Sequence, residues 1–256
     1  MSVNWDRTAA DYASFRAGFP DEFYDRLGAD GIANGGARKH ALDLGTGTGT
    51  LARGLAVRGW RVTGLDISAD MIGAARRLDA AAGIDVDYLV ARSEATGLPA
   101  AAFDLVSAGT CWHWFDRPAA AREVHRLLKP KGRLVVAAME WQSRPGNVVS
   151  ATCALIRRHN PRWPSDQLGF RFEWAEDVSA VGFAIVDRFQ FDVAVPYTHE
   201  TWRGRIRASA GVSASLDATA VDAFDREHAE LLRARFPEEP LAVPHRILAI
   251  VARKES

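Results

Sequence analysis

An alternation of short apolar runs with helical stretches is the feature of this 256-residue chain that most restricts its fold. Five apolar runs follow one another between His40 and Ala138, at 41–44, 61–65, 86–90, 103–108 and 132–138. In the intervals 50–58, 68–82 and 117–128, apolar residues recur at roughly helical spacing. This order predicts an α/β fold in which a parallel sheet carries helices on both faces.

The remaining segments predict an elaboration of that sheet. Residues 1–30 read as helical and amphipathic, whereas 143–180 are rich in Pro and Trp and are predicted to be irregular. Strands are expected at 184–195 and 245–253, with helices near 200–210 and 217–235 between them. Since these helices interrupt two strands, we expect them to form a small cap. The chain is predicted to be one domain over 1–256, divided at 1–36, 37–142 and 143–256.

Charge and cysteine content exclude several classes of protein. Lys and Arg total 32 against 32 Asp and Glu, so the net charge is zero and gives no electrostatic case for binding nucleic acid or an anionic membrane. No apolar run approaches 18 residues, and the N-terminus lacks a signal segment. Cys111 and Cys153 lie far apart without metal-ligand spacing. These features predict a cytoplasmic protein with reduced thiols and no metal site. We expect a monomer or a homodimer.

A glycine-rich loop lies where the first strand gives way to a helix. Closely spaced glycines in Leu42–Gly49 permit a tight turn and let a ligand approach the backbone. The following helix presents N–H groups and the positive end of its dipole. Asp66 ends the next strand about 21 positions after Gly45, where a carboxylate accepts hydrogen bonds from both hydroxyls of a ribose.

Two cofactors fit this description. The dinucleotide pattern G-x-G-x-x-[GA] fails from Gly45 and is met from Gly47 to Ala52, but that match begins two residues beyond the strand end. An acidic-x-G-x-G-x-G loop is filled without a gap by Asp43, Gly45, Gly47 and Gly49. The second pattern is that of S-adenosylmethionine (SAM) methyltransferases, so we favour SAM. An NAD(P)-dependent reductase and a SAM-binding protein without catalysis are the alternatives.

Over about residues 5–142 the chain resembles the class I SAM-dependent methyltransferases. Their second motif is matched by Thr63–Met71, where Asp66 would hold the ribose and Ile67 would pack on the adenine. The third motif starts at Arg92-Ser93-Glu94 in place of the usual Asp-Ala, which leaves an adenine contact to the Ser93 backbone or Glu94. The turn before the fifth strand also matches, at 127–136. The resemblance implies a Rossmann-like, mostly parallel seven-stranded sheet, with S-adenosylhomocysteine as product.

Within the class, the chain is most similar to the small-molecule branch, which includes trans-aconitate, quinone-ring and natural-product methyltransferases. Its N-terminal Tyr-x-x-x-Arg element is matched by Tyr12 and Arg16, and implies a lid helix at the methionine end of SAM. The cofactor residues that the resemblance implies are Tyr12, Arg16, Asp43, Gly45, Thr46, Gly47, Asp66, Ile67, Met71, Ser93, Glu94 and Gly109.

An aromatic cluster follows the fourth strand, at 108–116. The [DN]-P-P-[YF] element with which nucleic-acid amino-methyltransferases grip a flipped base is absent there, which argues against DNA or RNA as acceptor. His113 is a candidate general base, although we favour a packing role for it. The expected acceptor-binding side chains are Trp5, Trp112, Trp114 and Trp141, on which a flat acceptor would stack.

Two arginines leave a second kind of acceptor open. Arg203 and Arg207 lie four positions apart in a predicted helix, so they share a face and are expected to meet a carboxylate. The favoured reaction is N- or C-methylation of a planar aromatic or heteroaromatic small molecule. Carboxylate O-methylation of a small acid is the alternative.

Overall fold

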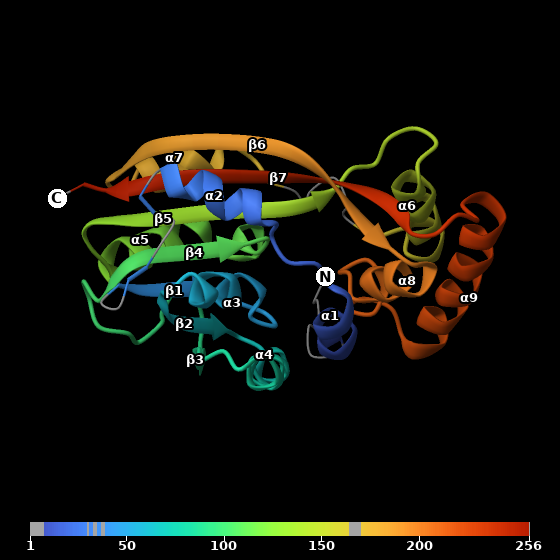
Figure 1. Ribbon diagram of the computed structural model, residues 1–256, viewed down its shortest axis with the longest axis horizontal. Coiled ribbons are helices and arrows are strands. Elements are labelled where there is room, and N and C mark those ends of the chain that lie inside the picture. The colour runs from blue at the N-terminus through green and yellow to red at the C-terminus, as the bar shows by residue number, and fades with distance from the viewer. Residues whose placement is uncertain (1–7, 30, 33–34, 37–38, 164–169, 256) are drawn as a thin grey trace. The chain divides into compact units, whose positions relative to one another are not determined.

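A computed structural model describes residues 8–29, 31–32, 35–36, 39–163 and 170–255. In these residues, the strands form one sheet in the order β3-β2-β1-β4-β5-β7-β6. Their bounds are β1 (His40–Leu44), β2 (Arg61–Asp66), β3 (Asp87–Val90), β4 (Phe103–Gly109), β5 (Leu128–Trp141), β6 (Phe183–Tyr197) and β7 (Leu241–Lys254). The pairs β2–β3, β1–β2, β1–β4 and β4–β5 are parallel, and β7 runs opposite to β5 (Figure 1). The predicted mostly parallel seven-stranded α/β fold is confirmed.

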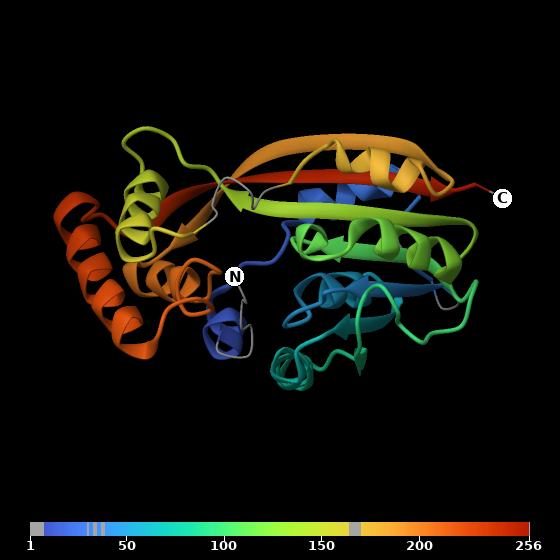
Figure 2. The same cartoon turned by 180° about the vertical axis from the view of Figure 1, so that it is seen from behind.

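Several of the described helices are capped by a side chain at the N-terminal end. Ser68 Oγ accepts a hydrogen bond from Met71 N at 3.1 Å, and Asp116 Oδ1 accepts one from Ala119 N at 3.1 Å. None of the described helices is long and apolar enough to cross a membrane. The helices are α1 (Ala9–Phe15), α2 (Asp21–Ala29), α3 (Thr50–Val57), α4 (Ala69–Ala82), α5 (Arg117–Leu127), α6 (Val148–His159), α7 (Trp174–Ser179), α8 (His199–Arg207) and α9 (Ala218–Arg235) (Figures 1 and 2).

The chain divides into two compact units. The sheet unit comprises Gly18–Met139, Phe170–Phe191 and Ile247–Ser256, and the helical unit comprises Met1–Ala17, Glu140–Gly169 and Asp192–Arg246. Strands β5, β6 and β7 each contribute residues to both units. Each unit has its own buried apolar cluster, with Trp112 among the core residues of the sheet unit and Trp202 among those of the helical unit. The single domain over 1–256 stays a prediction.

The predicted irregular segment 143–180 is wrong in two places. It contains α6 and α7. Asn147 caps α6 by accepting a hydrogen bond from Ser150 N at 2.8 Å, and Pro145 and Pro161 lie outside the helix on either side. The prolines therefore mark the ends of a helix instead of an irregular region. The predicted N-terminal helical stretch is two helices, α1 and α2, separated at 16–20.

Candidate functional site

The glycine loop follows β1 in the sheet unit and depends on backbone angles that suit glycine. Gly45, Gly47 and Gly49 have φ values of 59°, 55° and 78°, in the left-handed region where an L side chain is strained. A Cβ atom on Gly45 would also lie 2.9 Å from Cys111 Cβ. Because α3 begins after Gly49 without a side-chain cap, the N–H groups of its first turn are suited to a ligand.

Asp43 lies beneath this loop, with 1% of its surface exposed. The parallel register places Ser107 of β4 opposite Asp43, and the hydroxyls of Ser107 and Thr46 each donate to its carboxylate at 2.7 Å. Burial raises the pKa of Asp43 to about 6, although the hydrogen bonds from both hydroxyls act against that rise. Asp43 was predicted as a cofactor residue. In the structure it is buried and ties the loop to β4, so its effect on a ligand is indirect.

Asp66 ends β2 and is held in place by two backbone amides. Gly47 N donates to Asp66 Oδ2 at 2.8 Å, and Ser68 N donates to Oδ1 at 2.9 Å. A carboxylate accepts hydrogen bonds at about four positions, so this anchoring is compatible with binding two ribose hydroxyls. The neighbouring Ile67 side chain is 60% exposed, which is unusual for a large apolar residue. By contrast, Met71 is 3% exposed and belongs to the interior of the sheet unit. Its contact with the cofactor stays a prediction.

The segment after β3 contacts the chain that follows β4. Glu94 Oε1 accepts a hydrogen bond from Asp116 N at 3.1 Å, and Arg92 lies 3.5 Å from the Glu94 carboxylate. Ser93 is buried, with 6% of its surface exposed. Its predicted contact with a ligand through the backbone does not require an exposed side chain. Glu94 thus fixes the start of α5.

The end of β4 carries a strained residue that the sequence does not reveal. Thr110 has φ of 61°, which is uncommon for a β-branched residue. Its N–H donates to Ala137 O at 2.7 Å, and its Oγ1 accepts from Met139 N at 3.3 Å. Beside it, a Cβ on Gly109 would lie 3.0 Å from Leu51 Cδ2. Backbone strain of this kind persists where neighbouring contacts enforce it, and it is frequent at functional sites.

The predicted aromatic cluster separates into a buried and an exposed part. Trp112 is 1% exposed and belongs to the core of the sheet unit, and its role as an acceptor-binding residue stays a prediction. Trp114 is 38% exposed, and the His113 ring centroid lies 4.8 Å from it. The His113 ring also stacks on Trp174 at 6.2 Å. The structure brings His113 and Trp114 together as one aromatic surface, and the general-base role of His113 stays a prediction.

Other predicted residues belong to the helical unit. The Arg16 guanidinium lies 4.5 Å from the Tyr12 ring centroid, and the Trp141 ring packs edge-on against Trp202 at 5.7 Å. Their roles at the cofactor and acceptor stay predictions. Trp5 lies outside the described residues.

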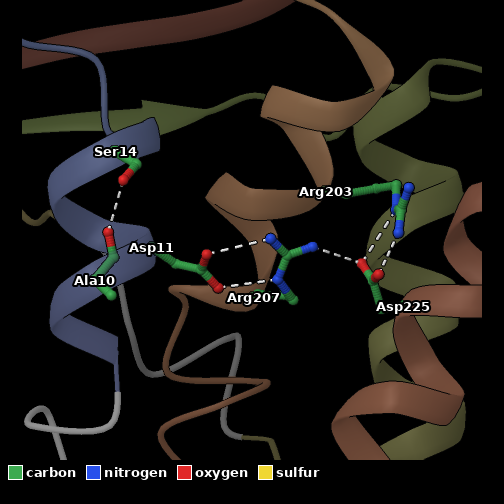
Figure 3. Close-up of polar contacts among 6 residues, drawn as sticks. All are labelled: Ala10, Asp11, Ser14, Arg203, Arg207 and Asp225. Atoms are coloured by element: carbon green, nitrogen blue, oxygen red, sulfur yellow. Dashed lines mark hydrogen bonds and ion pairs between the residues drawn. The ribbon is translucent and has the colours of Figure 1, made fainter.

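Arg203 and Arg207 share a helix face, and both form ion pairs with acidic side chains of the same chain (Figure 3). Arg207 donates to both oxygens of Asp11, at 2.9 and 3.1 Å, and to Asp225 at 2.9 Å. Arg203 pairs with both oxygens of Asp225. Asp11 and Asp225 thus supply carboxylates to both arginines, and the binding of an acceptor carboxylate by Arg203 and Arg207 stays a prediction. The network joins α1, α8 and α9.

The segment that contains the glycine loop is similar to known proteins. Residues 42–136 match the family described as "Methyltransferase domain". An uncharacterized methyltransferase of Schizosaccharomyces pombe is 26% identical over 225 residues, covering 87% of this chain and 83% of the relative. The demethylmenaquinone methyltransferase of Thermus thermophilus is 43% identical over 103 residues, covering 39% of this chain and 47% of the relative. The chain thus spans about half the length of that second relative.

A solved structure shows the same fold. The protein from Anaeromyxobacter dehalogenans, assigned as a type II methyltransferase, superposes with a TM-score of 0.61 at 23% identity, over 94% of this chain and 98% of that one. Among the described residues, no group of three or more His, Cys, Asp or Glu is arranged to hold a metal ion.

Proposed function

We propose that the chain is a class I SAM-dependent methyltransferase that transfers a methyl group from SAM to a small metabolite, as the match of residues 42–136 to a methyltransferase domain supports. The observation that carries this proposal is the glycine turn of 45–49 joined to Asp66. Three left-handed glycines open the loop, and the Gly47 amide aligns the Asp66 carboxylate. This is the arrangement that a nucleoside with two ribose hydroxyls requires.

The residues at the ends of β1 and β2 are suited to binding SAM. Asp66 supplies the acceptor for the ribose hydroxyls, and the exposed Ile67 supplies an apolar surface for the adenine. The uncapped first turn of α3 supplies N–H donors. Asp43 supports the site indirectly, because its carboxylate accepts a hydrogen bond from Thr46 and so holds the glycine loop in place. When bound, SAM supplies an electrophilic methyl group on a sulfonium sulfur.

The task of the protein is chiefly to position the acceptor and exclude water. Positioning alone contributes up to about 7–11 kcal/mol of barrier reduction in well-oriented reactions. In the sheet unit, the exposed Trp114 ring and the adjoining His113 ring form a surface on which a planar acceptor would stack. This surface supports a planar aromatic or heteroaromatic acceptor, methylated at N or C. The Thermus relative is named as a demethylmenaquinone methyltransferase.

A metabolite screen that measures S-adenosylhomocysteine release tests this function. The purified chain is assayed with SAM against planar nitrogen heterocycles, phenols and quinones, and against aliphatic amines and acids. We expect release with members of the planar group, and none with Asp66→Ala. Release only with aliphatic compounds would overturn the planar acceptor, and equal release by Asp66→Ala would overturn the cofactor site.

A further inference from the structure

A cluster of basic side chains lies at the amino ends of three strands of the sheet unit. Four of the 32 basic residues of the chain are lysines, and three of these, Lys39, Lys129 and Lys131, line one cavity of about 260 Å³ together with Arg133 and Asp104. They precede β1 or belong to the starts of β4 and β5, which run parallel (Figure 1). The glycine loop follows β1 at its other end, and the five residues of β1 span about 16 Å.

The start of β5 is an irregular segment that presents two of these lysines. The pairing register with β4 shifts there, so that the four residues 129–132 lie opposite the single residue 104. Within this segment Lys131 has φ of 64°, in the left-handed region that favours glycine. Strain of this kind is frequent at functional sites. Because a glycine would avoid the strain, it points to a use for the Lys131 side chain.

The cavity carries an excess of positive charge. Lys129 Nζ donates to Asp104 Oδ2 at 2.8 Å. Burial raises the pKa of Asp104, but the hydrogen bonds from Lys129 and from a backbone amide outweigh it and hold that pKa below its usual range. Lys39, Lys131 and Arg133 form no ion pair within the described part of the chain. Three cations therefore repel one another until an anion binds.

Two of these unpaired cations are held in place. Lys39 Nζ lies 5.5 Å from the centroid of the Trp60 ring, whose indole N–H donates to Ile32 O at 3.3 Å. Arg133 Nη1 donates to Lys131 O at 2.9 Å, whereas its Nε is buried and has no hydrogen-bond partner among the described residues. A buried donor in this state indicates an ion or a water that completes it. The limited freedom of these side chains reduces the entropy cost of binding a ligand.

The chemistry and size of the cavity favour a small, multiply charged anion. Lysine ammonium groups bind phosphate as point charges, and a guanidinium binds two of its oxygens. The cavity volume of about 260 Å³ lies below the range of about 300–1,000 Å³ for drug-sized ligands, which favours a small molecule. We propose that Lys39, Lys131 and Arg133 form a binding site for the phosphate group of a small molecule, separate from the site proposed for SAM.

Calorimetric titration of the full chain in about 150 mM NaCl tests phosphate binding. Inorganic phosphate and phenyl phosphate are each titrated, with phenol as the uncharged counterpart of the ester. We expect one phosphate compound per chain with a Kd of about 1 mM or below, and no binding of phenol. The tighter of the two phosphates identifies the ligand as free phosphate or as an ester. Binding of neither compound would overturn the site, and binding of polyglutamate alone would replace it with a docking surface for an acidic protein.

Lys131→Gly separates a binding role from a structural one. It removes one cation and the backbone strain together, so we expect the Kd for phosphate to rise about fivefold or more while Tm is equal to or above that of the wild type. A Tm well below that of the wild type would show that Lys131 serves the fold and would contradict the inference from the strain.

Two further variants complete the titration. Arg133→Gln should raise the Kd for phosphate about tenfold. Arg77→Gln is the control, because Arg77 is an exposed cation on α4 that does not line the cavity, and its Kd should stay within about twofold. If the Kd is unchanged in Arg133→Gln, or rises as much in Arg77→Gln, the anion does not bind at these residues.

The small number of lysines allows the ligand to be located. An amine-acetylating reagent modifies lysines, and mass spectrometry reports the rate at each position. Phosphate at about ten times its Kd should slow the acetylation of Lys39 and Lys131 severalfold relative to Lys254, which does not line the cavity and donates to His125 O and Leu128 O. Equal rates with and without phosphate at Lys39 and Lys131 would refute the location.

Titration in the presence of SAM tests whether the two sites are separate. We expect the Kd for phosphate to stay within about twofold when SAM is added, and Lys131→Gly to bind SAM as the wild type does. Displacement of phosphate by SAM would place the anion at the glycine loop and contradict the proposal. Failure of the proposed function is distinguishable, since it appears as an absence of SAM binding while phosphate still binds.

Discussion

Asp43→Asn is expected to change the pH dependence of stability while leaving the fold intact. Asp43 is 1% exposed and accepts hydrogen bonds from Thr46 and Ser107 at 2.7 Å. Asparagine has the same shape and can accept from one of these hydroxyls and donate to the other. The substitution therefore removes a titrating group from beneath the glycine loop with little change in packing.

The magnitude follows from the pKa of Asp43. Burial raises it to about 6 from an ordinary value of 3.8, so the folded state binds more protons than the unfolded state between these pH values. The contribution of Asp43 to the free energy of unfolding is therefore highest at acid pH and falls as the pH rises through about 6. Between about pH 4.5 and 7.5 the two pKa values give a loss of about 2 kcal/mol. The asparagine of the variant does not titrate.

Urea unfolding followed by tryptophan fluorescence measures this effect. We expect the free energy of unfolding of Asp43→Asn, minus that of the wild type, to rise by about 2 kcal/mol from pH 4.5 to pH 7.5. Asp192→Asn is the control, because Arg246 holds the pKa of Asp192 below its usual range and its contribution changes only at more acid pH. If the difference in the free energy of unfolding between Asp43→Asn and the wild type stays constant from pH 4.5 to 7.5, the raised pKa of Asp43 is refuted.

Three further substitutions test the site. Asp66→Ala removes the anchored carboxylate and should raise the Kd for SAM by about tenfold or more, measured by calorimetry; unchanged affinity would refute the ribose assignment. Gly45→Ala should lower the free energy of unfolding by about 1–2 kcal/mol or more, and Tm with it, because φ is 59° and the new Cβ would lie 2.9 Å from Cys111. An unchanged Tm would show that the loop adapts and would contradict the strain. His113→Ala should lower kcat less than about tenfold between pH 6 and 9; a loss of about 100-fold or more would instead assign a general base.

The parts of the molecule with strong local patterns were predictable. The alternation of apolar runs and helices predicted the parallel strands, and the spacing of Gly45, Gly47 and Gly49 predicted a tight turn, in which the structure gives all three glycines a positive φ. Asp66 was predictable because its place at the end of a strand fixes its side chain beside the loop. These features depend on residues close in sequence, so pattern and position are sufficient.

Features that depend on tertiary partners were not predictable. Trp112 looks like a binding residue by position but is enclosed in the sheet core. Arg203 and Arg207 share a face as predicted, yet Asp11, which lies 196 residues earlier, neutralises Arg207. The same cause hides the burial of Arg205, which is 9% exposed. Burial and charge pairing between distant segments decide these roles, and a single sequence does not report them.

Titration of the purified chain with SAM and, separately, with NADPH tests the central claim most directly. The glycine turn joined to Asp66 predicts saturable binding of SAM, weakened in Asp66→Ala, and no binding of NADPH. Saturable binding of NADPH without binding of SAM would contradict the account and assign the loop to a dinucleotide.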